Sequence, residues 1–112
     1  MPDERFEELV GDALDMIPED LAAAIDNVVV LVEARHPEDP GMLGLYQGIA
    51  LTSRDSQYGG SLPDTITIYR DAILDICATE DDVVDEVAVT VIHEVAHYFG
   101  IEEERLHQLG WG

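Results

Sequence analysis

The sequence predicts an α+β fold, because helical and strand patterns both occur along one short chain. Residues 6–17 carry an apolar stripe at helical spacing, and residues 28–32 and 64–69 have the composition of strands. Residues 80–100 are apolar around much of the circumference of a helix, so we expect one central buried helix there. A chain of 112 residues holds one hydrophobic core but not two, and residues 1–112 are therefore expected to form a single domain.

The N-terminal part predicts two helices followed by a strand. The first helix places its apolar residues on one face: Phe6, Leu9, Val10, Ala13, Leu14 and Ile17. Pro18 suits the first turn of a short second helix that ends near Ile25, because the missing N–H of proline needs no partner there. The β-branched run 28–32 is short and uninterrupted, which predicts a buried strand.

Residues 37–63 are rich in Gly and Pro and predict a long loop with brief strand-like pieces around residues 45–46 and 49–51. Residues 64–69 then alternate with a period of two, so the strand has two different faces. One face would carry Ile66 and Ile68 toward the core, and the other would be wet, with Thr65, Thr67 and Tyr69.

The central helix has clear start and stop signals. Thr79 and Asp82 form a capping-box pattern, so the helix is expected to begin near Glu80, and Gly100 is expected to end it. Residues 101–109 predict one last short helix.

Composition excludes several function classes. The formal net charge is −20, and the five basic residues are all arginines scattered along the chain, so we expect no nucleic-acid partner and no anionic membrane partner. The first residues resemble no secretory signal, and no apolar run approaches the roughly 20 residues needed to cross a bilayer. We therefore expect a cytoplasmic protein, in which the single Cys77 forms no internal disulfide.

The central helix carries a motif with specific chemistry, His93-Glu94-Val95-Ala96-His97. Residues four apart on a helix lie about 40° apart around the axis, so both imidazoles can converge on one ion. Glu94 projects beside them and can accept a proton without being a ligand, which is the arrangement of the zinc-peptidase signature. The alternative is that both histidines are ordinary polar positions on an exposed stripe.

Catalytic zinc needs a third protein ligand and an open position. Gly100 can adopt a left-handed conformation and return the chain over the histidines, which makes Glu103 the first candidate, with Glu104 and His107 in reserve. Carboxylates at residues 102–104 would also be favourable at the start of a final helix, without any metal.

Written out, residues 93–103 are HEVAHYFGIEE, which resembles the zincin metallopeptidases, and the whole chain is similar to short bacterial proteins with a minimal zincin-like fold. The resemblance implies a small mixed sheet packed on the metal-bearing helix, with helices at both ends of the chain. It also implies that the strand before this helix, residues 64–69, lies at the cleft and pairs with an extended peptide. Thr65, Thr67 and Tyr69 are then expected to bind substrate. No methionine follows the motif, so the methionine turn of metzincins is absent.

The leading hypothesis is a zinc-dependent hydrolase of peptide bonds with weak or restricted turnover. Zn²⁺ on His93, His97 and Glu103 would polarise water and the scissile carbonyl, and Glu94 would act as the general base. The substrate would be a peptide or protein, and the negative field would favour neutral or cationic peptides.

No oxyanion donor is evident from the sequence, and Tyr69, Tyr98 and His107 all stay possible. Few residues follow the motif to form a second cleft wall, so a protein partner is a possible source of that wall. The first rival hypothesis is a non-catalytic metal-binding or interaction module with the same ligands. The second is a metal-dependent ribonuclease, which would need a basic groove that this composition does not provide.

Overall fold

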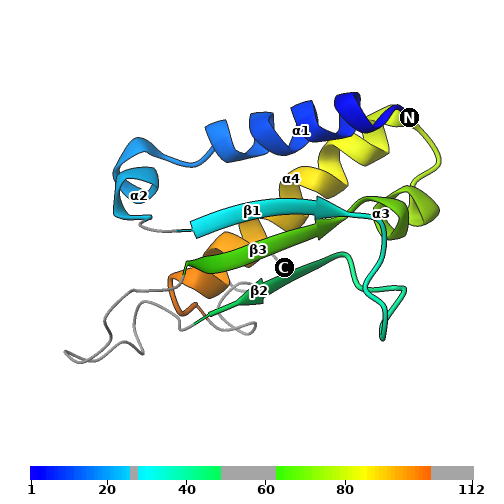
Figure 1. Cartoon of the computed structure of the whole chain (residues 1–112). Coiled ribbons are helices and arrows are strands. Elements are labelled where there is room, and N and C mark those ends of the chain that lie inside the picture. Colours follow the sequence, from blue (N-terminus) through cyan, green and yellow to red (C-terminus); the bar gives the residue numbers. More distant parts are fainter. Residues whose placement is uncertain (26–27, 49–62, 102–112) are drawn as a thin grey trace.

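A computed structural model describes residues 1–25, 28–48 and 63–101 and confirms the α+β class (Figure 1). Helices lie on one face of a small sheet, and the longest helix crosses behind it. In chain order the elements are α1 (Asp3–Asp15), α2 (Glu19–Ala24), β1 (Val28–Glu33), β2 (Gly44–Gln47), β3 (Asp64–Tyr69), α3 (Arg70–Ile76) and α4 (Glu80–Tyr98).

The sheet formed by the described strands has the order β1-β3-β2, with β3 in the centre. β1 pairs with β3 in parallel from Val28 opposite Asp64, and β2 pairs with β3 antiparallel from Gly44 opposite Ile68. The sheet is therefore mixed, as the resemblance implied. The piece expected around residues 45–46 is confirmed as β2, while the piece at residues 49–51 lies outside the described residues.

The prediction of a wet face on β3 is wrong. Thr67 and Tyr69 are only 4% and 3% exposed, and Ile66 and Ile68 are buried on the opposite face. A central strand has neighbours along both edges and cover on both faces, so the alternation of Thr and Ile here marks two different buried environments.

The prediction of a buried strand at residues 28–32 is also wrong. β1 lies at an edge of the described sheet, and its side chains alternate between half-buried and exposed. Val29 and Leu31 are 41% and 42% exposed, while Val28, Val30 and Val32 pack against the core. A continuous β-branched run is therefore compatible with an edge strand that has only one covered face.

The core lies between the sheet and the pair of helices α1 and α4. α1 supplies its predicted stripe, and α4 supplies valines spaced by four residues on the facing side. The buried apolar cluster consists of Phe6, Leu9, Val10, Ala13, Ile66, Ile68, Ile73, Val83, Val87, Val91 and Val95. α4 packs against α1, α3 and the sheet. This packing makes the helix a rigid support for the residues at its C-terminal end.

Helix α3 was missed by the sequence patterns. β3 runs into it without a turn residue, since Tyr69 is the last strand residue and Arg70 the first helical one. The Asp71 N–H donates to the carbonyl of Ala34, which ties the start of α3 to the end of β1 (3.0 Å). A helix of 7 residues shows too few turns for helical periodicity to stand out.

Both predicted ends of α4 are confirmed. The Thr79 side chain accepts from the Asp82 N–H, and the Asp82 carboxylate accepts from the Thr79 N–H, which completes the capping box (3.2 Å each). At the other end Gly100 has φ of 80°, its N–H donates to the His97 carbonyl, and the Ile101 N–H donates to the Ala96 carbonyl. This Schellman-type ending lies three residues after His97 and makes the chain leave the helix there.

Gly11 offers a direct test of helix energetics in α1. It lies inside the helix on its exposed side, and a Cβ added there would meet nothing within 4 Å. We expect Gly11→Ala to raise the free energy of unfolding by about 0.5–1 kcal/mol, because alanine loses less backbone entropy in a helix. Urea unfolding of both proteins measures the difference, and an unchanged or lower value would contradict a stable α1.

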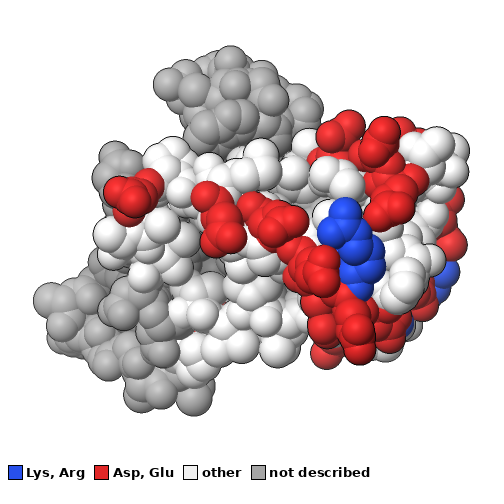
Figure 2. Space-filling model, turned by 90° about the horizontal axis from the view of Figure 1, so that it is seen from above, with Lys and Arg blue, Asp and Glu red and all other residues white. Residues whose placement is uncertain are grey.

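Acidic side chains dominate the face seen in Figure 2 and gather toward the end of the molecule where the chain begins. The few basic groups there are surrounded by carboxylates, as expected from the net charge of −20. Within the ranges that the structure describes, no helix has the length and apolar character required to cross a membrane.

Candidate metal centre

The two motif histidines converge at the C-terminal end of α4. Both side chains are half-buried, and their Nε2 atoms lie 3.0 Å apart. The ring planes meet at 69°, with ring centres 4.7 Å apart, so the rings approach edge to face and do not stack. At this separation one ring nitrogen can donate a hydrogen bond to the other, or both nitrogens can face one cation.

The geometry fits two corners of a zinc site. Imidazole nitrogens bound at about 2.0–2.1 Å to a tetrahedral zinc are roughly 3.3 Å apart. The observed Nε2 separation of 3.0 Å is close to this value, and both nitrogens come from consecutive turns of one packed helix. The two rings therefore suit zinc with only a small adjustment of side-chain angles.

Glu94 lies between the two histidines in sequence and is itself buried, with 7% of its surface exposed. It packs under the start of β2, where a Cβ added at Gly44 would lie 3.1 Å from Glu94 Cγ and Oε2 and 2.8 Å from Thr90 Cγ2. The absence of a side chain at residue 44 thus lets the β2 backbone come directly against the carboxylate.

Replacing Gly44 tests whether this close contact positions Glu94. We expect Gly44→Ala to lower the free energy of unfolding by about 1–3 kcal/mol, because the added methyl overlaps the buried side chains of Thr90 and Glu94. Gly41→Ala is the matched control, since a Cβ there would meet only Asp39 Oδ1 at 3.9 Å. Urea unfolding of both variants gives the comparison, and equal stability of the two would show that β2 does not press on α4.

The residues predicted to supply a third metal ligand lie outside the described part of the chain. Glu103, and the reserves Glu104 and His107, belong to residues 102–112, as do residues 102–109 of the predicted final helix. Residues 1–25, 28–48 and 63–101 contain no group of three or more His, Cys, Asp or Glu side chains suited to a metal. Assignment of Glu103 as a ligand stays a prediction. The bend at Gly100, on which that assignment depends, is present.

Addition of a peptide strand to residues 64–69 does not fit this sheet, because both edges of β3 are already paired. Thr67 and Tyr69 are buried, while Thr65 keeps partial exposure. Burial raises the pKa of the Tyr69 hydroxyl, and the nearby Glu33 carboxylate raises it further, so this tyrosine stays protonated. Contact of these three residues with substrate stays a prediction.

Tyr98, one of the candidate oxyanion donors, is fully buried. Its ring packs edge to face against Tyr46, with ring centres 6.2 Å apart, and against Phe99 at 5.2 Å. Tyr46 in turn donates its hydroxyl to the buried Asp64 carboxylate (2.6 Å). These contacts join β2, β3 and the end of α4 next to His97. The role of Tyr98 as an oxyanion donor stays a prediction.

A cavity of about 230 Å³ opens beside His93 and Glu94. Its remaining lining residues come from α4 and from the start of β2: Glu86, Val89, Thr90, Leu43 and Gly44. The sequence patterns did not single out this set. Val89 is 48% exposed, although residues 80–100 were expected to form a buried helix. The helical spacing of residues 86, 89, 90 and 93 was a signal that these side chains share one face with the motif.

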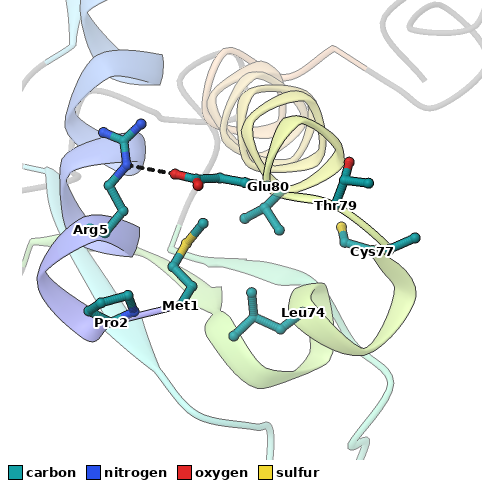
Figure 3. A pocket seen from close by; sticks show the side chains of 9 residues that line it. Met1, Pro2, Arg5, Leu74, Cys77, Thr79 and Glu80 are labelled. Carbon is teal, nitrogen blue, oxygen red and sulfur yellow. Dashed lines mark hydrogen bonds and ion pairs between the residues drawn. The ribbon is translucent and has the colours of Figure 1, made fainter.

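A second cavity, of about 370 Å³, lies where the chain start meets the beginning of α4 (Figure 3). Arg5 reaches across it to Glu80 (3.1 Å), and Cys77 and Met1 line it. Burial raises the pKa of the Cys77 thiol, and the charges of Glu86 and Asp82 add to the effect, so the thiol is not activated. This cavity borders the first turn of α4, which is more than 10 residues, or about 15 Å along the helix, from His93.

Comparison with known proteins identifies the family of the chain. The family model for zincin-like metallopeptidases matches residues 25–111, which is most of the chain. The chain belongs to the zincin-like metallopeptidase family. No curated protein matches the sequence.

A solved structure similar to this zincin-like protein is a conserved hypothetical protein from Thermus thermophilus. The two sequences are 28% identical, the match covers 97% of each chain, and the TM-score is 0.61. The similarity therefore extends over nearly the whole length of both chains.

Proposed function

We propose that this zincin-like protein is a zinc-dependent peptidase whose turnover is slow or restricted to few substrates. The observation that carries the proposal is the 3.0 Å separation of the His93 and His97 Nε2 atoms, with Glu94 buried beside them. Membership of a metallopeptidase family supports the reaction class. When bound, zinc supplies the Lewis acidity that polarises a carbonyl and makes water more acidic.

Residues of this chain would bind the cation and transfer the proton. His93 and His97 hold the cation, and Glu103 is the proposed third ligand. Glu94 accepts a proton from the attacking water and returns it to the leaving amine. The tight packing of Gly44 against the Glu94 side chain limits the positions that its carboxylate can take, which favours a fixed base over a mobile one.

Two measurements on the full-length protein test the proposal. Elemental analysis of the protein as isolated should find one zinc per chain, and incubation with a broad library of unstructured peptides should yield cleavage products detectable by mass spectrometry. Cleavage should stop when a chelator removes the zinc and return when zinc is restored. Stoichiometric zinc without any cleavage would instead support the non-catalytic metal-binding module, and an absence of bound zinc would contradict both.

A further inference from the structure

We propose that the cavity beside His93 and Glu94 receives a positively charged side chain of the substrate, arginine or lysine, and that Glu86 supplies the countercharge. This inference rests on the proposed peptidase function, because it assigns the side-chain preference of the same site. Its binding step needs no metal, however, so it can be tested separately.

The size of the cavity points to one side chain. Its volume is about 230 Å³. Pockets that enclose a whole small molecule are commonly about 300–1,000 Å³, while one water occupies about 30 Å³ in the liquid. A space of this size next to the motif suits a single long side chain of a peptide whose backbone passes over the histidines.

The lining changes in character along the helix. Glu86, Val89 and His93 lie on one face of α4, and seven residues separate the first from the last, or about 10 Å along the axis. Val89 and Leu43 provide apolar surface beside this path. A side chain entering near His93 therefore meets apolar groups along its stem and a carboxylate further along. Arginine and lysine have this combination of apolar stem and charged end.

The charge of the cavity also favours a cation. Glu86 is half-buried, and no Arg partner reaches it within the described part of the chain. The described arginines are paired elsewhere, Arg5 with Glu8 and Glu80, Arg35 with Asp75, and Arg70 with Asp3 and Asp71. Glu94 lines the same cavity, and the net charge of the chain is −20. An acidic side chain would be repelled here, and a neutral one would leave the Glu86 carboxylate partly desolvated without a partner.

The test uses two small probes of nearly equal shape and different charge. N-acetyl-arginine methylamide and N-acetyl-citrulline methylamide are titrated into metal-free, full-length protein, and backbone amide shifts are followed by NMR. We expect the arginine probe to shift the amides of Val89 and Thr90 and to bind about three- to tenfold more tightly than citrulline, the range of one partly screened ion pair.

The matched variants separate a local effect from the overall field. Glu86→Gln and Asp85→Asn change the net charge equally and lie next to each other on α4, but Asp85 is exposed and does not line the cavity. The preference for arginine over citrulline should disappear in Glu86→Gln and persist in Asp85→Asn. Equal binding of the two probes, no shift of Val89 and Thr90, or equal loss of preference in both variants would overturn the proposal.

The outcome is distinguishable from failure of the peptidase proposal. If arginine binds beside Val89 and Glu86→Gln abolishes the preference while zinc-loaded protein cleaves nothing, the cavity binds cationic side chains and the peptidase proposal alone fails. If the zinc-loaded protein cleaves peptides but neither probe distinguishes Glu86→Gln from the parent, the peptidase proposal stands and the inference fails.

Discussion

Replacement of Glu94 by glutamine is expected to lower peptide cleavage by about 10²–10⁴-fold while zinc stays bound. Glutamine has nearly the same shape, so it fits the space under Gly44, but its amide cannot accept the proton that the attacking water must lose. The measurement is the initial rate of cleavage of the best library peptide, together with the zinc content of the same samples.

Glu7→Gln is the matched control, because it makes the same change at an exposed position of α1. It should leave both rate and zinc content unchanged. A Glu94→Gln protein that cleaves normally would remove Glu94 from the mechanism. One that loses its zinc would show that Glu94 is a ligand, contrary to its proposed role as base.

The local parts of this fold were predictable from the sequence because their causes are local. The stripe of α1 and the capping box at Thr79 each depend on residues a few positions apart, and both are found where expected. The same holds for the convergence of His93 and His97, which follows from helical geometry alone. The bend at Gly100 belongs to this class as well, since only glycine adopts its φ of 80° without strain.

Features that depend on distant segments were not predictable in this way. A Thr/Ile alternation looks the same whether a strand is central or at an edge, and what buries Thr67 and Tyr69 is brought there by the topology. For β1 the sequence predicted more burial than the structure has, since its valines alone cannot reveal that only one face is covered. The β-propensity of a segment predicts that it forms a strand, but it does not predict which segments pack around that strand.

The candidate site also has one part that depends on local sequence and one part that depends on a distant segment. Glu86, Val89 and Thr90 share a helical face with His93, and that part of the cavity was within reach of periodicity. Leu43 and Gly44 lie just before and at the start of β2, more than 40 residues earlier in the chain, and the antiparallel pairing of β2 with β3 places them at α4. The importance of a missing side chain at Gly44 follows from this contact and from no local motif.

Replacement of His97 by alanine should remove most of the bound zinc, because it deletes one of the two imidazoles that hold the cation. Loss of a hydrogen-bond partner of a metal ligand already costs about 10–100-fold in affinity, so loss of a ligand itself should cost more than about 100-fold. Competition with a chromogenic chelator measures the affinity. Cleavage should be lost with the metal.

Thermal unfolding gives an independent reading of the same change. Zinc that binds only the folded state stabilises it by about 2.7 kcal/mol at a concentration 100 times its Kd, so the parent protein should unfold at higher temperature when zinc is added. His97→Ala should show no such increase. His36→Ala is the control, because His36 lies in the loop after β1 and its Nδ1 accepts from the N–H groups of Glu38 and Asp39 (3.1 Å each). That variant should lose loop contacts and keep the full response to zinc. An equal response in all three proteins would mean that zinc binds away from the two imidazoles at the end of α4, and the catalytic role of Glu94 would then lose its basis.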